Sequence, residues 1–410
     1  MNQAALEGIR LLDFSHVYQG PVGTQILADY GADVIKVERP GSGDWSRSWG
    51  PFTKGVSLPF ANLNRNKRSI TVDLKSPEGK EMILELVKSA DVLVHNFRKG
   101  TMTRVRLGYE DIVKINPEII YASSSGWGDH GPYVDRNRPG HDMMARAEGG
   151  WFIFYDKDKP PIPGGVSIDY PSGLNLIIGI LIALIGRGKT GQGQLVTTDL
   201  LSVAFHSHAW DAASRLNQEK IDRPAAVGGT KAAIYKAFTT ADGFIEISPV
   251  FSNNVLKDIS LAMSLDDLSE QEPFSTEDLQ IENSEELNAI LAKRFKDKTT
   301  DEWLGILEPK GILCARINAF DDVTNDPQIA CNNMIVEMEH KDAGKLRLLG
   351  NPVRLSKTPS TLRQAPPDLG EHSEAIAKEL GYSEDEIEKL ITKGILGRGS
   401  SSEFSEQTSS

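Results

Sequence analysis

The stretch GGVSIDYPSG, residues 164–173, contains a single acidic residue, Asp169, at the point where a long hydrophobic run begins. Aspartate is a favoured N-cap of helices, and Pro171 suits the first helical turn. The same backbone amides could instead hold a carboxylate nucleophile that faces a cleft. The local sequence leaves both roles open for Asp169, structural capping and covalent catalysis.

The tripeptide GHD at residues 140–142 lies about 27 residues before Asp169. A histidine beside an aspartate is most often one half of a structural hydrogen-bonded pair. Histidine also titrates near neutral pH, so an acid–base role for His141 is a second interpretation. The pair Gly228 and Gly229 indicates a flexible turn.

Basic residues cluster in the first quarter of a chain that is acidic overall. A solvated surface would explain such a cluster. However, several members follow expected strands, and strand exits at one edge of a parallel sheet form a shared ligand rim. Arginines on such a rim suit phosphate groups, which they can grip with two hydrogen bonds. The cluster includes Lys36, Arg39, Arg65, Lys67, Arg68, Lys75, Arg98, Lys99, Arg104 and Arg106.

Alternating strands and helices must position these residues. The first unit is expected to comprise a strand at 9–15, a turn at 16–23, a helix at 24–31 and a strand at 32–41. Further strands are expected at 69–76, 91–97 and 118–128, which predicts an α/β fold with a parallel sheet. The glycines of the first turn do not spell GxGxxG, which argues against a dinucleotide site.

The composition is that of an ordinary globular protein of 410 residues with a net charge of −12. This charge disfavours nucleic acid or an anionic membrane as the main partner. Cys314 and Cys331 form no disulfide or zinc pattern, and the first residues do not resemble a signal peptide, so a cytoplasmic location is expected. The apolar run 174–186 is short for a membrane span and predicts a buried helix after Asp169.

The chain is expected to divide into two domains. Apolar periodicity is lost near 215–232, so residues 225–325 are interpreted as a smaller domain. Residues 1–224 and 326–396 then form a large domain from both chain ends. The tail, 397–410, has no core-forming content and is expected to be disordered.

The opening LLDFSHVYQGPVGTQILADYGADVIKVERPGSGDWSR resembles the start of class III CoA-transferases, the CaiB/BaiF family. Later blocks, among them RNKRSITVDLKSPEGK, VHNFRKGTMTR, NPEIIYASSSGWGDHGPY and GNPVRLSKTP, resemble family blocks in the same order. The resemblance covers about residues 6–396. Single blocks are weak signals, but the ordered series is specific.

The resemblance implies a Rossmann-like large domain, a smaller α/β domain and a homodimer whose subunits interlock like linked rings. It implies that Asp169, with Gly173 four residues on, is the nucleophile, and that Tyr18, Gln19, His141, Gly228 and Gly229 lie near the substrate. The implied CoA-binding residues are His16, Val17, Arg39, Leu74, Lys75, Asn96, Phe97, Arg104 and, with weaker support, Arg138.

The implied reaction moves CoA from an acyl-CoA donor, such as succinyl-CoA, to a small carboxylic acid. It passes through an aspartyl anhydride and an aspartyl-CoA thioester, and it needs no metal and no tightly bound cofactor, because the CoA thioester is itself the substrate. The reaction needs an ionised carboxylate, and a helix N-terminus is expected to favour that form of Asp169. A glycine loop at Gly228–Gly229 would close over the site and exclude water.

Two alternatives remain. GHD is also the block of the related α-methylacyl-CoA racemases, in which His141 and Asp169 would be the two bases of a racemase or isomerase. Those enzymes carry a further Glu where this chain has Phe251, which weakens the alternative. A CoA-binding homologue without turnover is the other possibility.

Overall fold

The computed structural model describes residues 4–153, 159–165, 167–217, 234, 236–248 and 253–399. The chain forms two compact units, one of Met1–His208 with Ala330–Ser410 and the other of Ala209–Ile329. The smaller unit begins before residue 225, the boundary expected from the sequence, because helix α10 (Ala209–Asn217) groups with it.

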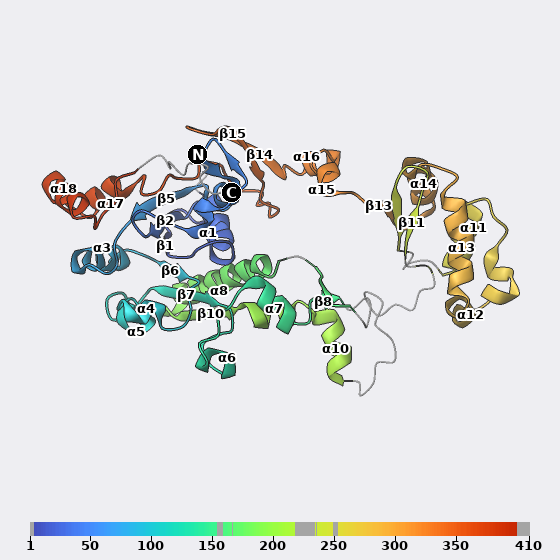
Figure 1. The fold of residues 1–410 in the computed structure, drawn as a ribbon, viewed down its shortest axis with the longest axis horizontal. Coiled ribbons are helices and arrows are strands. Elements are labelled where there is room, and N and C mark those ends of the chain that lie inside the picture. Colours follow the sequence, from blue (N-terminus) through green and yellow to red (C-terminus); the bar gives the residue numbers. More distant parts are fainter. Residues whose placement is uncertain are drawn as a thin grey trace. The chain divides into compact units, whose positions relative to one another are not determined.

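The large unit is built on a sheet of six parallel strands in the order β10-β7-β6-β1-β2-β5 (Figure 1). The order reverses between β1 and β6, as in doubly wound nucleotide-binding folds, where ligands bind beside the carboxyl ends of the strands. The predicted α/β fold with a large parallel sheet is therefore confirmed. The strands are β1 Arg10–Asp13, β2 Asp33–Glu38, β5 Lys67–Thr71, β6 Val92–His95, β7 Ile120–Ser125 and β10 Leu195–Asp199.

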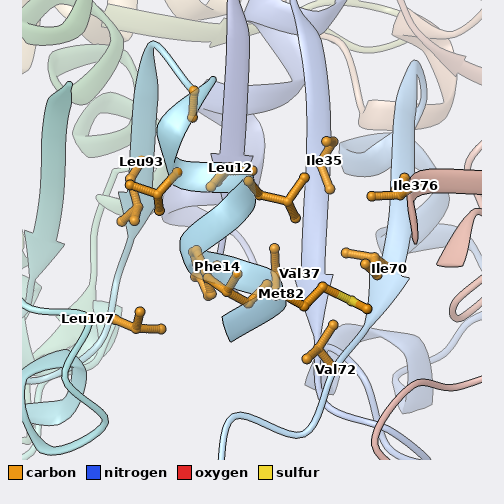
Figure 2. Close-up of a cluster of buried hydrophobic side chains, with 14 of the residues drawn as sticks. Leu12, Phe14, Ile35, Val37, Ile70, Val72, Met82, Leu93, Leu107 and Ile376 are labelled. Atoms are coloured by element: carbon orange, nitrogen blue, oxygen red, sulfur yellow. The ribbon is translucent and has the colours of Figure 1, made fainter. Parts of the chain in front are cut away.

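Helices cover both faces of this sheet. Leu12 and its neighbours pack with α3 (Pro77–Lys88), α17 (Ser373–Glu379) and α18 (Glu384–Thr392), so the C-terminal segment completes the first core (Figure 2). Leu11 points to the opposite face, where α1 (Gln19–Asp29) and α8 (Asp169–Thr190) form the second core. Successive residues of one strand thus serve two cores, which explains the continuous apolar runs.

Helix α8 buries only one of its faces, whereas the sequence predicts a buried helix. Leu176 and Ile180 lie in the second core, but Ile178, Ile182 and Ile185 are 53%, 63% and 65% exposed. By length and composition alone α8 could also cross a membrane. Its packing against the sheet is that of a core helix, and its apolar outer face is left uncovered in a single chain.

The smaller unit contains the antiparallel sheet β11-β12-β13 with helices packed against it. A hairpin turns around Asp242–Gly243, where β11 (Lys236–Thr239) pairs with β12 (Phe244–Ile247). Strand β13 is Cys314–Arg316, and the helices are α11 Val255–Ala262, α12 Glu277–Glu282, α13 Ser284–Phe295 and α14 Thr300–Leu307. At its centre Phe295 stacks on Phe238 and meets Trp303 edge to face.

Short elements complete the large unit. The hairpins are β3–β4 (Phe52–Thr53, Val56–Ser57), β8–β9 (Phe152–Ile153, Ile162–Pro163) and β14–β15 (Ile335–His340, Gly344–Leu349). Its shorter helices are α2 Leu58–Asn64, α4 Thr101–Arg104, α5 Tyr109–Ile112, α6 Pro132–Asp135, α7 Asp142–Glu148 and α9 Leu200–His206. Helix α15 (Phe320–Val323) belongs to the smaller unit, and α16 (Pro327–Cys331) crosses the boundary between the units in the sequence.

A buried ion pair anchors β1 to β5. Lys67 Nζ lies 3.0 Å from Asp13 Oδ2 and also donates to Thr24 Oγ1 at 2.8 Å and Asn64 Oδ1 at 2.9 Å. Burial alone would raise the pKa of Asp13, but Lys67, with Lys36, lowers it to about 2. Part of the basic cluster is therefore internal, because both lysines and Arg65 are buried beside aspartates.

Replacing Lys67 with Ala is expected to lower the free energy of unfolding by about 3–5 kcal/mol, because Asp13 would keep its buried charge without its ion-pair partner. The matched control is Lys88→Ala, which removes an exposed ion pair with Glu85 and should change stability by no more than about 1 kcal/mol. Urea denaturation of both variants checks the difference. Equal stability would show that the Asp13–Lys67 pair is dispensable.

Candidate active site

The carboxyl ends of β1 and β6 meet where the strand order reverses. His16 donates its backbone N–H to Asn96 Oδ1 at 2.9 Å, and Asn96 Nδ2 donates to the His16 carbonyl at 2.8 Å. The His16 and Phe97 rings lie 5.4 Å apart. Residues that are 80 positions apart in sequence are thus joined at the place where a parallel sheet offers its ligand site.

The turn after β1 is held in a strained conformation by a second buried ion pair. Val17 has φ +69°, a left-handed conformation that is unfavourable for a β-branched residue. Its N–H donates to Asp44 Oδ1 at 3.0 Å, and Lys36 Nζ lies 2.8 Å from Asp44 Oδ2. Lys36 also donates to the Ser15 carbonyl at 2.8 Å. The Lys36–Asp44 pair therefore fixes the backbone from which Tyr18 and Gln19 project.

Helix α1 begins at Gln19, five residues before the helix start expected from the sequence. The glycines interpreted as turn residues are packing positions instead. A Cβ on Gly20 would lie 2.2 Å from Ser15 Cβ, and one on Gly173 would lie 2.4 Å from Val22 Cγ1 and 2.5 Å from the Gln19 carbonyl oxygen. Gly173 thus lets the first turn of α8 approach the first turn of α1, which places Asp169 beside the Tyr18–Gln19 turn.

Asp142, not Asp169, caps helix α8. The N-cap position is Ile168, whose side chain makes no capping bond, and Asp169 is the first helical residue. Asp142 Oδ1 accepts hydrogen bonds from the N–H of Ile168 at 2.5 Å and of Asp169 at 3.4 Å, and from Ser167 Oγ at 3.0 Å. The capping interpretation of Asp169 is therefore wrong, because Asp169 already lies inside the helix and Asp142 accepts from the first amides, those of Ile168 and Asp169.

His141 and Asp142 do not form the hydrogen-bonded pair expected for this dipeptide. The exposed His141 caps its own helix, α7, where its Nδ1 accepts from the Met143 N–H at 3.3 Å. Asp142 points toward α8 and lies 3.5 Å from Arg146 Nη1. An acid–base role for His141 remains a prediction. The next residue, Asp142, contacts the backbone of Asp169.

The carboxyl group of Asp169 is poorly solvated and has no compensating donor. Burial, together with the nearby charge of Asp142, raises its pKa to about 7. Within the described part of the chain, no group donates a hydrogen bond to its side-chain oxygens. The sequence predicts that the helix N-terminus keeps this group ionised. Instead its pKa is raised, because the effect of burial outweighs that of the helix N-terminus. Burial, followed by the charge of Asp169, also raises the pKa of Tyr18, which places both side chains in one environment.

The remaining residues expected to bind CoA follow the carboxyl ends of neighbouring strands. Exposed Arg39 follows β2, and exposed Arg104 ends α4 after β6. Arg138 follows β7 and is paired with Glu148 at 2.7 Å, with its guanidinium 4.6 Å from the Trp127 ring centroid. Leu74 and Lys75 follow β5. Their positions after the strands are those expected of a shared rim, and both the rim and its binding of CoA remain predictions.

Sequence reasoning missed two carboxylates. Asp142 was considered only as a partner of His141, and no local signal shows that it binds the amides of a helix that begins at Asp169. Asp44 lies in a loop after β2 and has no local signal for its role under Val17. Gly228, Gly229 and Phe251 lie outside the described residues, as does the predicted tail from residue 400 onward.

The family model described as "CoA-transferase family III" matches residues 6–373 of this chain. Succinyl-CoA:glutarate CoA-transferase of Mus musculus is 38% identical over 395 residues, covering 95% of this chain and 90% of that protein. Formyl-CoA:oxalate CoA-transferase of Rhodopseudomonas palustris is 35% identical over 422 residues, covering 96% and 97%.

Among solved structures, a CaiB/BaiF family protein from Brucella suis superimposes with a TM-score of 0.81 at 32% identity, covering 93% of this chain and all of that one. The fold with its parallel sheet is thus shared with that CaiB/BaiF family protein. The chain belongs to CoA-transferase family III, and the recognition made from its ordered sequence blocks is confirmed.

Replacing Asp169 with Asn is expected to stabilise the folded protein at pH 8. The pKa of Asp169 is raised from an ordinary 3.8 to about 7, so its contribution to stability is full below pH 3.8 and is lost as the pH rises through 7. Thermal unfolding should show an increase in Tm of about 2 °C or more at pH 8 and a smaller one at pH 5. Glu78→Gln, an exposed first-turn carboxylate of α3, should give no increase at pH 8. A lower Tm for Asp169→Asn at pH 8 would mean that the carboxylate stabilises the fold.

Proposed function

We propose that this CoA-transferase moves CoA from an acyl-CoA donor, such as succinyl-CoA, to a small carboxylic acid, with Asp169 as the covalent nucleophile. The supporting observation is the half-buried carboxylate of Asp169, which receives no hydrogen bond from the described residues, while Asp142 accepts from the first amides of α8. A group whose hydrogen bonds are left unmade is available to a substrate. The raised pKa also makes the ionised form a stronger base.

The proposed reaction has four displacements. A carboxylate oxygen of Asp169 attacks the thioester carbonyl of the donor, the C–S bond breaks, and CoA leaves as the thiolate, giving an aspartyl–acyl anhydride. The thiolate then attacks the aspartyl carbonyl, which releases the donor acid and forms an aspartyl-CoA thioester. The acceptor carboxylate attacks that same carbonyl and again expels the thiolate. The thiolate finally attacks the acceptor acyl group, which forms the new thioester and restores Asp169.

The rim residues are proposed to hold CoA. Arg39, Arg104 and Arg138 would contact its anionic groups, since guanidinium groups bind phosphates with two donors. Phe97 offers an aromatic surface beside His16. The other proposed contacts are Val17, Leu74, Lys75 and Asn96. Tyr18, Gln19 and His141 are proposed to contact the acyl group, and Gly228–Gly229 to close over it.

The burial of Gln19 supports its proposed contact with the acyl group. Gln19 is 4% exposed, and its Nε2 has no hydrogen-bond partner among the described residues. A buried amide donor without a partner is unfavourable unless a ligand supplies one. An acyl or carboxylate oxygen bound beside Asp169 would do so.

We also propose that the protein is a homodimer with interlocked subunits. The supporting observation is the uncovered apolar face of α8, since Ile178, Ile182 and Ile185 share one helix face and lie exposed in a single chain. Contiguous apolar faces of this kind are typical of subunit interfaces. A cytoplasmic location, and the absence of nucleic-acid and membrane partners, remain proposals that rest on composition.

Trapping tests the nucleophile. Incubation with succinyl-CoA, followed by hydroxylamine and peptide mass spectrometry, is expected to give an adduct on the peptide that contains Asp169. Asp169→Ala should lose transfer completely while CoA affinity stays within a few-fold. Glu118→Gln, a change in an exposed loop, is the control and should retain the adduct.

An adduct would establish covalent transfer. A second outcome is that no adduct forms with any of a panel of acyl-CoAs although CoA still binds. If solvent deuterium then enters the acyl chain, the result would favour the racemase or isomerase, with His141 and Asp169 as proton carriers. If no exchange and no deuterium were observed, the chain would be a CoA-binding homologue without turnover.

Sedimentation velocity tests the dimer. Ile182→Asp is expected to raise the dissociation constant at least about 100-fold, because a charge would be buried in an apolar interface. Leu261→Asp on α11 of the smaller unit, where the side chain is similarly exposed, is the control and should leave association unchanged. A wild-type protein that sediments as a monomer would contradict the proposal.

A further inference from the structure

Two residues of α7 hold the chain segment that carries Asp169. Asp142 and Arg146 are one helical turn apart and each is 9% exposed. Asp142 Oδ1 binds the segment after residue 166, through Ser167, Ile168 and Asp169. Arg146 Nη2 binds the segment before it, donating to the carbonyls of Gly164 at 2.6 Å and Gly165 at 3.3 Å. We call Asp142 and Arg146 the α7 clamp.

The clamp changes what Asp169 can do. An aspartate in the first turn of a helix normally folds back onto the free amides, where hydrogen bonds and the helix dipole stabilise its charge and weaken it as a base. Here Asp142 accepts from two of the first amides of α8, those of Ile168 and Asp169. The side-chain oxygens of Asp169 accept no hydrogen bond from the described residues.

The clamp also brings a second negative charge close to Asp169. Arg146 lies 3.5 Å from Asp142, which pairs the two charges without a short hydrogen bond. Tyr18, from the β1–α1 turn, is affected by the charge of Asp169, and Tyr170, the next residue on α8, acts on Tyr18 in turn. Neither tyrosine supplies a positive charge. Asp142 is thus the charged neighbour of Asp169, and it is a like charge that disfavours ionisation.

We propose that Asp142 is the positioning residue of the nucleophile: it caps α8 in place of Asp169 and, through its charge, keeps Asp169 basic until an acyl-CoA arrives. This inference rests on the proposed role of Asp169 in covalent transfer. Arg146 acts through Asp142 and through the backbone of Gly164, and touches no reacting atom.

Two variants separate the charge of Asp142 from its hydrogen bonds to the α8 amides. Asp142→Asn keeps a side-chain oxygen that can accept from the Ile168 and Asp169 amides, but it removes the charge. Asp142→Ala removes both the charge and the cap, so the Asp169 carboxylate becomes free to cap its own helix. A purely structural role for Asp142 would affect the Ala variant and leave the titration of Asp169 in the Asn variant unchanged.

The experiment measures the pH dependence of Asp169 in two ways. Carbodiimide labelling of the free protein, quantified by peptide mass spectrometry, reports the titration of the carboxyl group without any substrate. The single-turnover rate of adduct formation with succinyl-CoA reports the reacting form. Glu85→Gln, an exposed carboxylate of α3, is the charge-loss control and should match the wild type in both.

For the wild type, both profiles are expected to have a midpoint near pH 7. For Asp142→Asn, both midpoints should move down by on the order of one pH unit, and the plateau rate of adduct formation above pH 8 should fall several-fold. CoA affinity should stay within about three-fold, since the clamp does not lie on the rim. Asp142→Ala should lose at least about 100-fold of the rate at every pH.

An unchanged labelling midpoint in a folded Asp142→Asn protein would overturn the inference, and so would an upward shift. The labelling profile needs no acyl-CoA, so it separates the two proposals. If the wild type forms no adduct but its Asp169 midpoint still moves in Asp142→Asn, the proposed covalent chemistry fails while the electrostatic coupling holds. If adducts form normally and the midpoint does not move, the nucleophile stands and the positioning role of Asp142 is wrong.

Discussion

The central constraint in this protein is a carboxyl group placed at the start of a helix whose first amides are bound by another carboxylate. Asp169 is half-buried, and Asp142 accepts from the amides of Ile168 and of Asp169 itself. Such an arrangement is unfavourable for folding, because the charged form is only partly hydrated and has no partner of opposite charge among the described residues. The arrangement is stable only if the surrounding structure fixes both the start of α8 and the side chain of Asp142. Three sets of contacts do so.

Each set relies on a different kind of contact. Arg146 ties α7 to the segment before α8. Glycines at the crossing of α1 and α8 let the two backbones approach more closely than any side chain would permit. Beneath the β1–α1 turn, Lys36 and Asp44 hold Val17 in a strained conformation. Buried ion pairs contribute little net stability, but breaking one is costly, so they suit the role of fixing a turn in one geometry. The strain and the unpaired carboxyl group lie on adjacent turns, as expected where folding stability is given up for reactivity.

Much of the fold could be predicted because hydrophobic runs and turn residues are local signals. The strands of the parallel sheet and the helix after Asp169 follow from such runs, and the ordered blocks identified the family. The exchange of roles between Asp142 and Asp169 could not be predicted, since both are plausible caps and only their three-dimensional placement decides between them. The early start of α1 was missed for a similar reason, because glycine signals a turn and a close helix crossing equally well. The burial of Lys36 and Lys67 was missed because a charge pattern does not show which lysines face aspartates across a sheet.

Helix α8 connects these observations to assembly. Its first turn carries Asp169, its inner face packs on the sheet, and its outer face presents isoleucines to solvent over the following turns. A helix is stiff along its axis, so a contact that fixed the outer face would also fix the direction from which Asp169 projects. If the proposed second copy covers that face, subunit association and the geometry of the nucleophile depend on the same rigid element. The apolar character of the whole helix then has a single explanation: one face is buried by folding and the other by association, which is why its sequence lacks the polar stripe of an ordinary surface helix.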